Sequence, residues 1–187
     1  MDETTDLTGH FLIAMPALDD PNFHHTVTLI CQHNEDGAMG VIFNRPLEVN
    51  LGEVFEHMEI KSIDKEMNQQ QVYYGGPVQV ERGFVLHVPD GDWESTMPIS
   101  DELAVTTSRD IIDDIAQHKG PEKYLIALGY AGWEAGQLEY EISENAWLSG
   151  PSSADIIFDT PYDKRWESAA SIIGVDLNLL SGDMGHA

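Results

Sequence analysis

This chain of 187 residues is expected to fold as one α+β domain, on three observations. Short apolar runs rich in β-branched residues are separated by clusters of Gly, Pro, Asn and Asp, a pattern typical of β-hairpins. Apolar residues at helical spacing occur only in a few scattered places. Strands and helices do not alternate regularly, which argues against a doubly wound parallel sheet. The length and the hydrophobic content of 42% suffice for one compact core.

In the first half of the chain the patterns predict a β-hairpin followed by a helix. The expected strands are 11–15, 26–32 and 40–43, with a turn at 34–37. Asn50, with Glu53 three residues later, has the pattern of a capping box. A helix is therefore expected to begin there, with apolar positions at Leu51, Val54, Phe55 and Met58.

In the second half the patterns predict further strands interrupted by helices. The expected strands are 72–74, 83–88, 103–106, 124–128, 147–148 and 155–158. The expected helices begin at Thr107 or Ser108, at Gln137 and at Trp166. We expect a single domain over residues 1–187, with residues 1–8 and 181–187 flexible.

The most distinctive segment is 129–141, in which three glycines and three aromatic residues follow the apolar run 124–128. The strand is expected to end at Leu128 and the chain to turn there. Hydrolases carry a Ser, Cys or Asp nucleophile in such a turn, but this one has Ala131. A serine hydrolase site is therefore excluded here. The favoured interpretation is that the glycines allow close packing beneath Trp133.

The charge of the chain narrows the classes of partner. With 33 acidic and 9 basic residues, the formal net charge is −24. Such a charge repels phosphate backbones and anionic lipids, so we expect no direct nucleic-acid or membrane binding. It favours a basic protein partner, or simply a solvated acidic surface. An acidic N-terminus and a single cysteine indicate a cytoplasmic protein without an intramolecular disulfide.

Cys31 and the histidines give weaker signals. Cys31 and His33 lie two apart on an expected strand and so project to the same face. A thiolate–imidazole pair is conceivable there, but Val27 and Leu29 share that face, which favours Cys31 as a small buried hydrophobe. We expect no metal and no cofactor, because no zinc spacing is matched by the donors of the first hairpin, His10, His24, His25, His33, Asp19 and Asp20.

Arg45 and Arg82 stand out because basic residues are scarce. Each lies close to a strand end or a glycine pair, where a guanidinium and backbone N–H groups could bind an anion. A salt bridge to one of the 33 carboxylates is the favoured alternative. We assign no catalytic residue. The candidate ligand-binding residues are Asn44, Arg45, Gly75, Gly76, His87 and Trp133.

Four sequence blocks together resemble the YqgE/AlgH family of bacterial proteins. They are GHFLIAMP at 9–16 with Phe23, GAMGVIFNRP at 37–46, YGGPV with GFVLH at 74–87, and segment 129–141 with Trp147-Leu148. The resemblance implies a compact α+β domain with flanking helices and a strongly curved, partly barrel-like mixed β-sheet. It brings no catalytic residues. One branch of the family carries the label of transcriptional regulator, linked to exopolysaccharide control.

We therefore expect a non-enzymatic binding or regulatory domain that acts through a protein partner. The alternative is a small-anion ligand-binding protein, or an enzyme, that uses a pocket near Arg45 and the glycine turns. A direct DNA-binding regulator is less favoured, because the chain offers no basic stripe or recognition helix.

Overall fold

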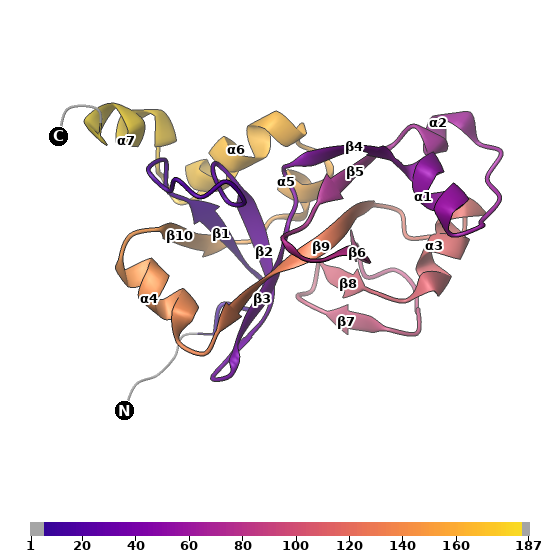
Figure 1. Ribbon diagram of the computed structural model, residues 1–187, viewed down its shortest axis with the longest axis horizontal. Helices are drawn as coiled ribbons and strands as arrows, with labels where there is room; N and C mark the ends of the chain where they lie inside the picture. Colours follow the sequence, from indigo (N-terminus) through magenta and orange to yellow (C-terminus); the bar gives the residue numbers. More distant parts are fainter. Residues whose placement is uncertain (1–5, 185–187) are drawn as a thin grey trace.

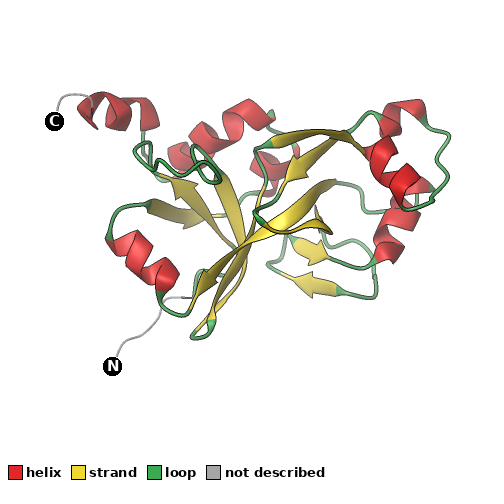
Figure 2. Cartoon of the chain, viewed as in Figure 1, coloured by secondary structure: helices red, strands yellow, loops and turns green. Residues whose placement is uncertain are grey.

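The structure, a computed structural model, describes residues 6–184 and confirms an α+β domain built on a curled mixed sheet (Figures 1 and 2). Its strands are β1 (His10–Ala14), β2 (Val27–Asn34), β3 (Gly37–Ile42), β4 (Pro46–Asn50), β5 (Gln71–Tyr74), β6 (Val78–His87), β7 (Thr96–Pro98), β8 (Ala104–Thr106), β9 (Tyr124–Glu134) and β10 (Trp147–Pro151). The path β10-β1-β2-β3-β9-β6-β8-β7 curls into half a barrel, as the resemblance implied. Strand β5 pairs with both β4 and β9 off this path.

The expected hairpin at 34–37 is present, and one pairing makes the sheet mixed. Strands β2 and β3 are antiparallel, with Asn34 opposite Gly37. The described neighbours are antiparallel except β5 and β9, where Tyr73 lies opposite Ala127 in a parallel register.

The expected turn after Leu128 is wrong, because β9 continues through the glycines to Glu134. Gly129 adopts φ +84, which lets the strand bend without ending. The chain turns only at Gly136, in a left-handed conformation before the next helix. The expected close packing of these glycines beneath Trp133 is wrong: a Cβ on Gly132 would meet only the Tyr130 ring, at 3.6 Å, and one on Gly136 nothing within 4 Å. The close approach is between strand backbones instead, since a Cβ on Gly129 would lie 2.4 Å from the carbonyl oxygen of Gly76. Sequence reasoning missed this because glycine marks turns and close backbone approaches equally.

The helices gather in separate groups around the sheet (Figures 1 and 2). They are α1 (Leu51–His57), α2 (Lys65–Asn68), α3 (Arg109–Ala116), α4 (Gln137–Ser143), α5 (Ala154–Phe158), the 3₁₀ turn η1 (Tyr162–Lys164), α6 (Arg165–Ile172) and α7 (Leu177–Met184). The capping box of Asn50 and Glu53 is confirmed, with both of its hydrogen bonds present. The expected strand 155–158 is wrong. It forms α5 instead, because the Ser153 side chain accepts a hydrogen bond from the N–H of Ile156 and starts a helix.

Strand β9 divides the core, because both of its faces are buried. Leu125 and Ala127 belong to the largest apolar cluster, inside the half-barrel. Ile126 points the other way, into a second cluster beneath α1 and α3. Farther along the strand, Ala131 and Trp133 join a third cluster with α4 and β10. The strand therefore connects every part of the core and carries the surfaces on which sites can form.

The ends of the described chain are held by specific contacts. Leu7 is buried, and its N–H donates to Nδ1 of His33 over 3.0 Å. Residues 177–184 form α7. The expected flexibility of residues 1–5 and 185–187 concerns positions outside the described residues. Within residues 6–184, no helix combines the length and apolar character needed to cross a bilayer.

Candidate functional site

Arg45 is engaged by the loop that precedes β2. Its Nη1 donates to the carbonyl oxygens of Pro21 and Asn22, both at 2.8 Å, and its Nη2 donates to that of His24 at 2.8 Å. Asn44 holds the same loop, donating to the carbonyl of His25 and accepting from the N–H of Val27. Within residues 6–180 Arg45 forms no salt bridge, so the favoured alternative is wrong there. The guanidinium clamps a loop.

The remaining candidate residues do not converge on Arg45. Gly75 and Gly76 lie near it, but their faces are closed by the backbone of β9. His87 is fully buried beside Tyr124, at the beginning of β9, whereas Trp133 lies near the end of that strand. Trp133 donates from Nε1 to Oε1 of Glu141, which also accepts from Trp147. These residues therefore serve separate parts of the fold.

A β-bulge, which the sequence pattern does not predict, changes the direction of the side chains between Cys31 and His33. The register of β2 and β3 shifts between Ile30 and Gln32. Cys31 lies in the largest core cluster, where burial raises its pKa to about 12. His33 instead contacts Leu7 and Glu139, beside the third cluster. The interpretation of Cys31 as a buried hydrophobe fits this burial, but the shared face was wrong, because the bulge reverses the alternation.

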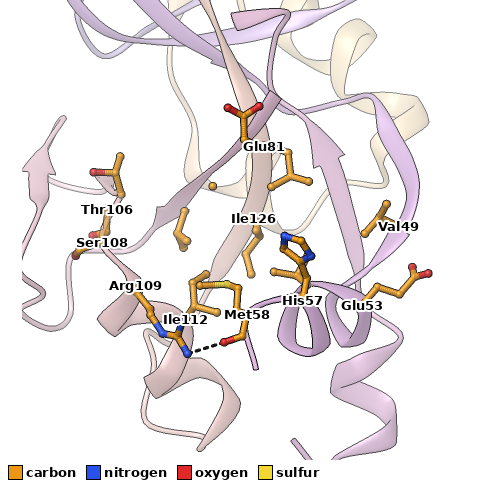
Figure 3. A pocket seen from close by; sticks show the side chains of 15 residues that line it. Val49, Glu53, His57, Met58, Glu81, Thr106, Ser108, Arg109, Ile112 and Ile126 are labelled. Carbon is orange, nitrogen blue, oxygen red and sulfur yellow. Dashed lines mark hydrogen bonds between the residues drawn. The ribbon is translucent and has the colours of Figure 1, made fainter. Parts of the chain in front are cut away.

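A cavity of about 490 Å³ lies elsewhere, between α1, α3 and the outer face of β6 and β9 (Figure 3). Its floor consists of two cross-strand pairs, Gly83 with Leu128 and Val85 with Ile126. Its apolar walls are Val54 and Met58 on α1, Ile112 on α3, and Val49. The alternation of the strands exposes these positions on one face, while their neighbours fill the half-barrel core.

Gly83 gives this cavity its depth. A Cβ at this position would meet no heavy atom of a non-neighbouring residue within 4 Å. Every larger side chain would project into the cavity, because position 83 faces the same side as Val85. Sequence reasoning included Gly83 in a strand but attached no function to it. The available signal was a glycine at an outward position of a strand, flanked by apolar residues.

Most polar groups at the rim are engaged in local structure. Ser108 donates from Oγ to Asp110 and accepts from the N–H of Ser95. Arg109 donates from Nη2 to the carbonyl of Met58 over 2.7 Å, joining α3 to the end of α1 (Figure 3). Glu53 belongs to the capping box. These groups shape the opening of the cavity.

Two rim side chains, Glu81 and His57, make no hydrogen bond to any described residue. Both are exposed, and Figure 3 shows them on β6 and α1 respectively, bordering the apolar floor. Glu81 adds to the acidic character of the rim, together with Glu53. In residues 6–180 no group of three His, Cys, Asp or Glu side chains is arranged to hold a metal ion.

Fold and cavity together define the class: a single-domain α+β protein with a half-barrel sheet and an apolar-floored, ligand-sized cavity. The chain belongs to the AlgH-like family, whose family model (DUF179) matches residues 11–178. This confirms the family that the sequence blocks indicated.

Relatives and solved structures agree over nearly the full length. A UPF0301 protein of Nitrosococcus oceani is 59% identical over 179 residues, covering 96% of each chain. Another, of Thioalkalivibrio sulfidiphilus, is 56% identical and covers both chains completely. The solution structure of the AlgH protein from Pseudomonas aeruginosa is 49% identical, with a TM-score of 0.81 over 97% of this chain and 96% of that one. A Corynebacterium diphtheriae protein of known crystal structure, 21% identical, shares the fold with a TM-score of 0.75 over 97% of this chain and 94% of its own.

Proposed function

We propose that this chain is a non-enzymatic binding protein whose 490 Å³ cavity receives an apolar side chain of a basic protein partner. The observation that carries the proposal is the apolar floor at Gly83, bordered by acidic side chains. An apolar recess of this kind is the usual receptor for a binding hot spot, because its filling removes apolar surface from water at a desolvated centre.

The rim favours binding over catalysis. Ser108, Arg109 and Glu53 are engaged in capping and in joining helices, as described above. His57 and Glu81 are exposed and have no hydrogen-bonding partner among the described residues that would hold either side chain on a reacting atom, as a general acid or base requires. The engaged groups fix the shape of the cavity, and shape complementarity provides the specificity.

Charge supports a basic partner. The chain carries a formal charge of −24, and the rim contributes Glu53 and Glu81. Complementary charge at a rim accelerates association and selects against acidic surfaces, whereas the apolar centre provides the affinity. The same charge works against a nucleic-acid ligand, so regulation by this protein, if it occurs in transcription, acts through other proteins.

The test is affinity capture from a cell extract, followed by titration of the purified partner by calorimetry. Gly83→Leu places an apolar side chain on the floor at a position where a Cβ meets no neighbouring atom within 4 Å, and we expect it to weaken binding at least about tenfold, or ~1.4 kcal/mol. Glu81→Lys is expected to slow association and to reduce its salt dependence. The matched control is Glu35→Lys, which makes the same charge change on an exposed residue of the β2–β3 turn.

Comparison of partner binding between the wild type and the variants tests the proposal. A partner bound by the wild type and by Glu35→Lys but not by Gly83→Leu supports the proposal. A partner bound equally well by Gly83→Leu contradicts it. Turnover of a small molecule by the purified chain, lost in Gly83→Leu, would favour the alternative of an enzyme or small-ligand protein, for which a cavity of about 490 Å³ is also large enough.

A further inference from the structure

Arg165, the first residue of α6, is a buried cation without a carboxylate partner. Only 6% of its surface is exposed. No carboxylate oxygen of residues 6–180 lies within 4.0 Å of its guanidinium. The guanidinium lies over the ring of Tyr73, 5.0 Å from the centroid. In a chain with 33 acidic residues, a cation enclosed without one of them is notable, because an unpaired buried charge is costly.

Two main-chain carbonyls use part of its hydrogen-bonding capacity. Nε donates to the carbonyl of Thr160 over 2.9 Å, and Nη1 donates to that of Phe43 over 2.5 Å. A guanidinium has five N–H donors, so one Nη1–H and both Nη2–H groups form no hydrogen bond to a described residue. These remaining donors form the end of the fork, which matches two oxygens of one anion.

Arg165 is one of the residues that line a pocket of about 200 Å³. This pocket lies where β5 and β9 begin, beside α5, and is separate from the larger cavity beneath α1 and α3. Gln70 and Tyr124 form its polar side, and the Tyr124 hydroxyl donates to Oε1 of Gln70 over 2.8 Å. That bond turns the Gln70 amide so that Nε2, which makes no hydrogen bond to a described residue, remains a donor.

We propose that this pocket, which we call the Arg165 pocket, binds a small oxyanion, a carboxylate or a phosphate, between the Arg165 fork and the Gln70 amide. The anion supplies the negative charge that no carboxylate of the described residues provides to Arg165. The volume lies below the roughly 300–1,000 Å³ typical of drug-sized ligands, so the pocket selects a small ion or the charged end of a slim molecule.

The test is an NMR titration of the full chain with sodium acetate and, separately, with sodium phosphate, against sodium chloride at equal ionic strength. We expect saturable shifts of the Arg165 Nε–H and Gln70 side-chain amide signals with acetate or phosphate and none with chloride. Stronger binding of acetate assigns a carboxylate ligand, and stronger binding of phosphate assigns a phosphate; either supports the shared chemistry.

Two variants separate binding from a purely structural role. Arg165→Lys keeps the charge but loses the fork, and we expect affinity to fall at least about tenfold. Gln70→Ala leaves every hydrogen bond of Arg165 intact and is expected to weaken binding several-fold, so it decides the matter if Arg165→Lys does not fold. Arg82→Gln, which removes an exposed cation elsewhere, should change nothing.

The proposal fails if neither anion gives saturable shifts, or if chloride reproduces them. It also fails if the shifts persist unchanged in Gln70→Ala while spreading over exposed arginines. Arg165 would then be a structural staple that holds the carbonyls of Phe43 and Thr160 and nothing more.

Discussion

The buried side chains of His87 and Thr106 are joined by a hydrogen bond of 2.7 Å between Nε2 and Oγ1. On the other side of the ring, Nδ1 lies 2.7 Å from the carbonyl oxygen of Val88. A carbonyl can only accept, so Nδ1 carries the proton, and the neutral ring accepts from the Thr106 hydroxyl at Nε2. The contact joins β6 to β8 behind the rim of the cavity.

This arrangement predicts an acid-sensitive contribution to stability. Burial lowers the pKa of His87 below 6.5, against smaller opposing effects of the Val88 carbonyl and the charge of Asp90. The unfolded chain therefore takes up its proton first as pH falls. The stabilisation by neutral His87 is present above pH 6.5 and is lost as pH falls through the folded-state pKa.

The check is urea unfolding of wild type and His87→Gln at about pH 7.5 and pH 5.5. Glutamine retains a hydrogen-bonding group near Thr106 but does not titrate. We expect the wild type to lose more free energy of unfolding than the variant between the two pH values. His25, whose pKa burial also lowers, is present in both proteins and cancels. Equal losses would mean that His87 does not titrate differently in the folded state.

Substitution by alanine should change the stability of the fold much more at Gly76 than at Gly83. A Cβ on Gly76, which has φ +152, would lie 2.1 Å from the carbonyl carbon of Tyr130. Gly76→Ala is therefore expected to destabilise the fold by about 3 kcal/mol, by overpacking and backbone strain. Gly83→Ala meets open space and should leave stability within about 1 kcal/mol of wild type. Thermal unfolding of both measures the contrast, and equal melting temperatures would refute the close approach at Gly76.

Substitution of Arg45 should destabilise the loop before β2 and affect little else in the fold. Arg45→Ala removes the hydrogen bonds to the carbonyls of Pro21, Asn22 and His24. We expect a loss of about 1–3 kcal/mol, since charge-assisted bonds are strong but these are partly open to solvent. Hydrogen exchange should accelerate at residues 18–26. Arg82→Ala is the control, expected within about 0.5 kcal/mol of wild type; protection of the loop in Arg45→Ala would contradict the clamp.

The rate at which a thiol reagent labels Cys31 should depend on unfolding, because the side chain is not accessible in the native fold. It is 1% exposed, and burial raises its pKa to about 12, so almost no thiolate is present near neutral pH. Labelling with a thiol reagent is expected to be slow in the native protein, at a rate that follows opening of the fold, and immediate in denaturant. Rapid labelling of the native protein would show that β2 opens locally.

Local patterns predicted the elements whose causes are local. The capping box of Asn50 and Glu53, the hairpin closing at Gly37 and the helix at Gln137 all depend on residues a few positions apart. One error, the strand expected at 155–158, had a local cause in the Ser153 cap, whereas two others arose where distant contacts decide. The glycines of segment 129–134 predict a turn, but the segment continues as a strand, against which the backbone of Gly75 and Gly76 packs closely. Cys31 and His33 face different clusters because of a bulge set by the pairing of β2 with β3.

The family, the α+β class and the acidic character of this protein could be recognised from residue order and composition alone, because blocks of neighbouring residues and summed charge need no coordinates. The cavity and the Arg165 pocket could not be recognised in this way. The floor of the cavity exists only because Gly83 is paired with Leu128, and the guanidinium of Arg165 reaches the carbonyl of Phe43 across 122 positions of sequence. Only the tertiary structure decides which arginine N–H groups form hydrogen bonds within the protein and which do not. The reason is that hydrogen-bond partners are set by proximity in space and not by spacing along the chain.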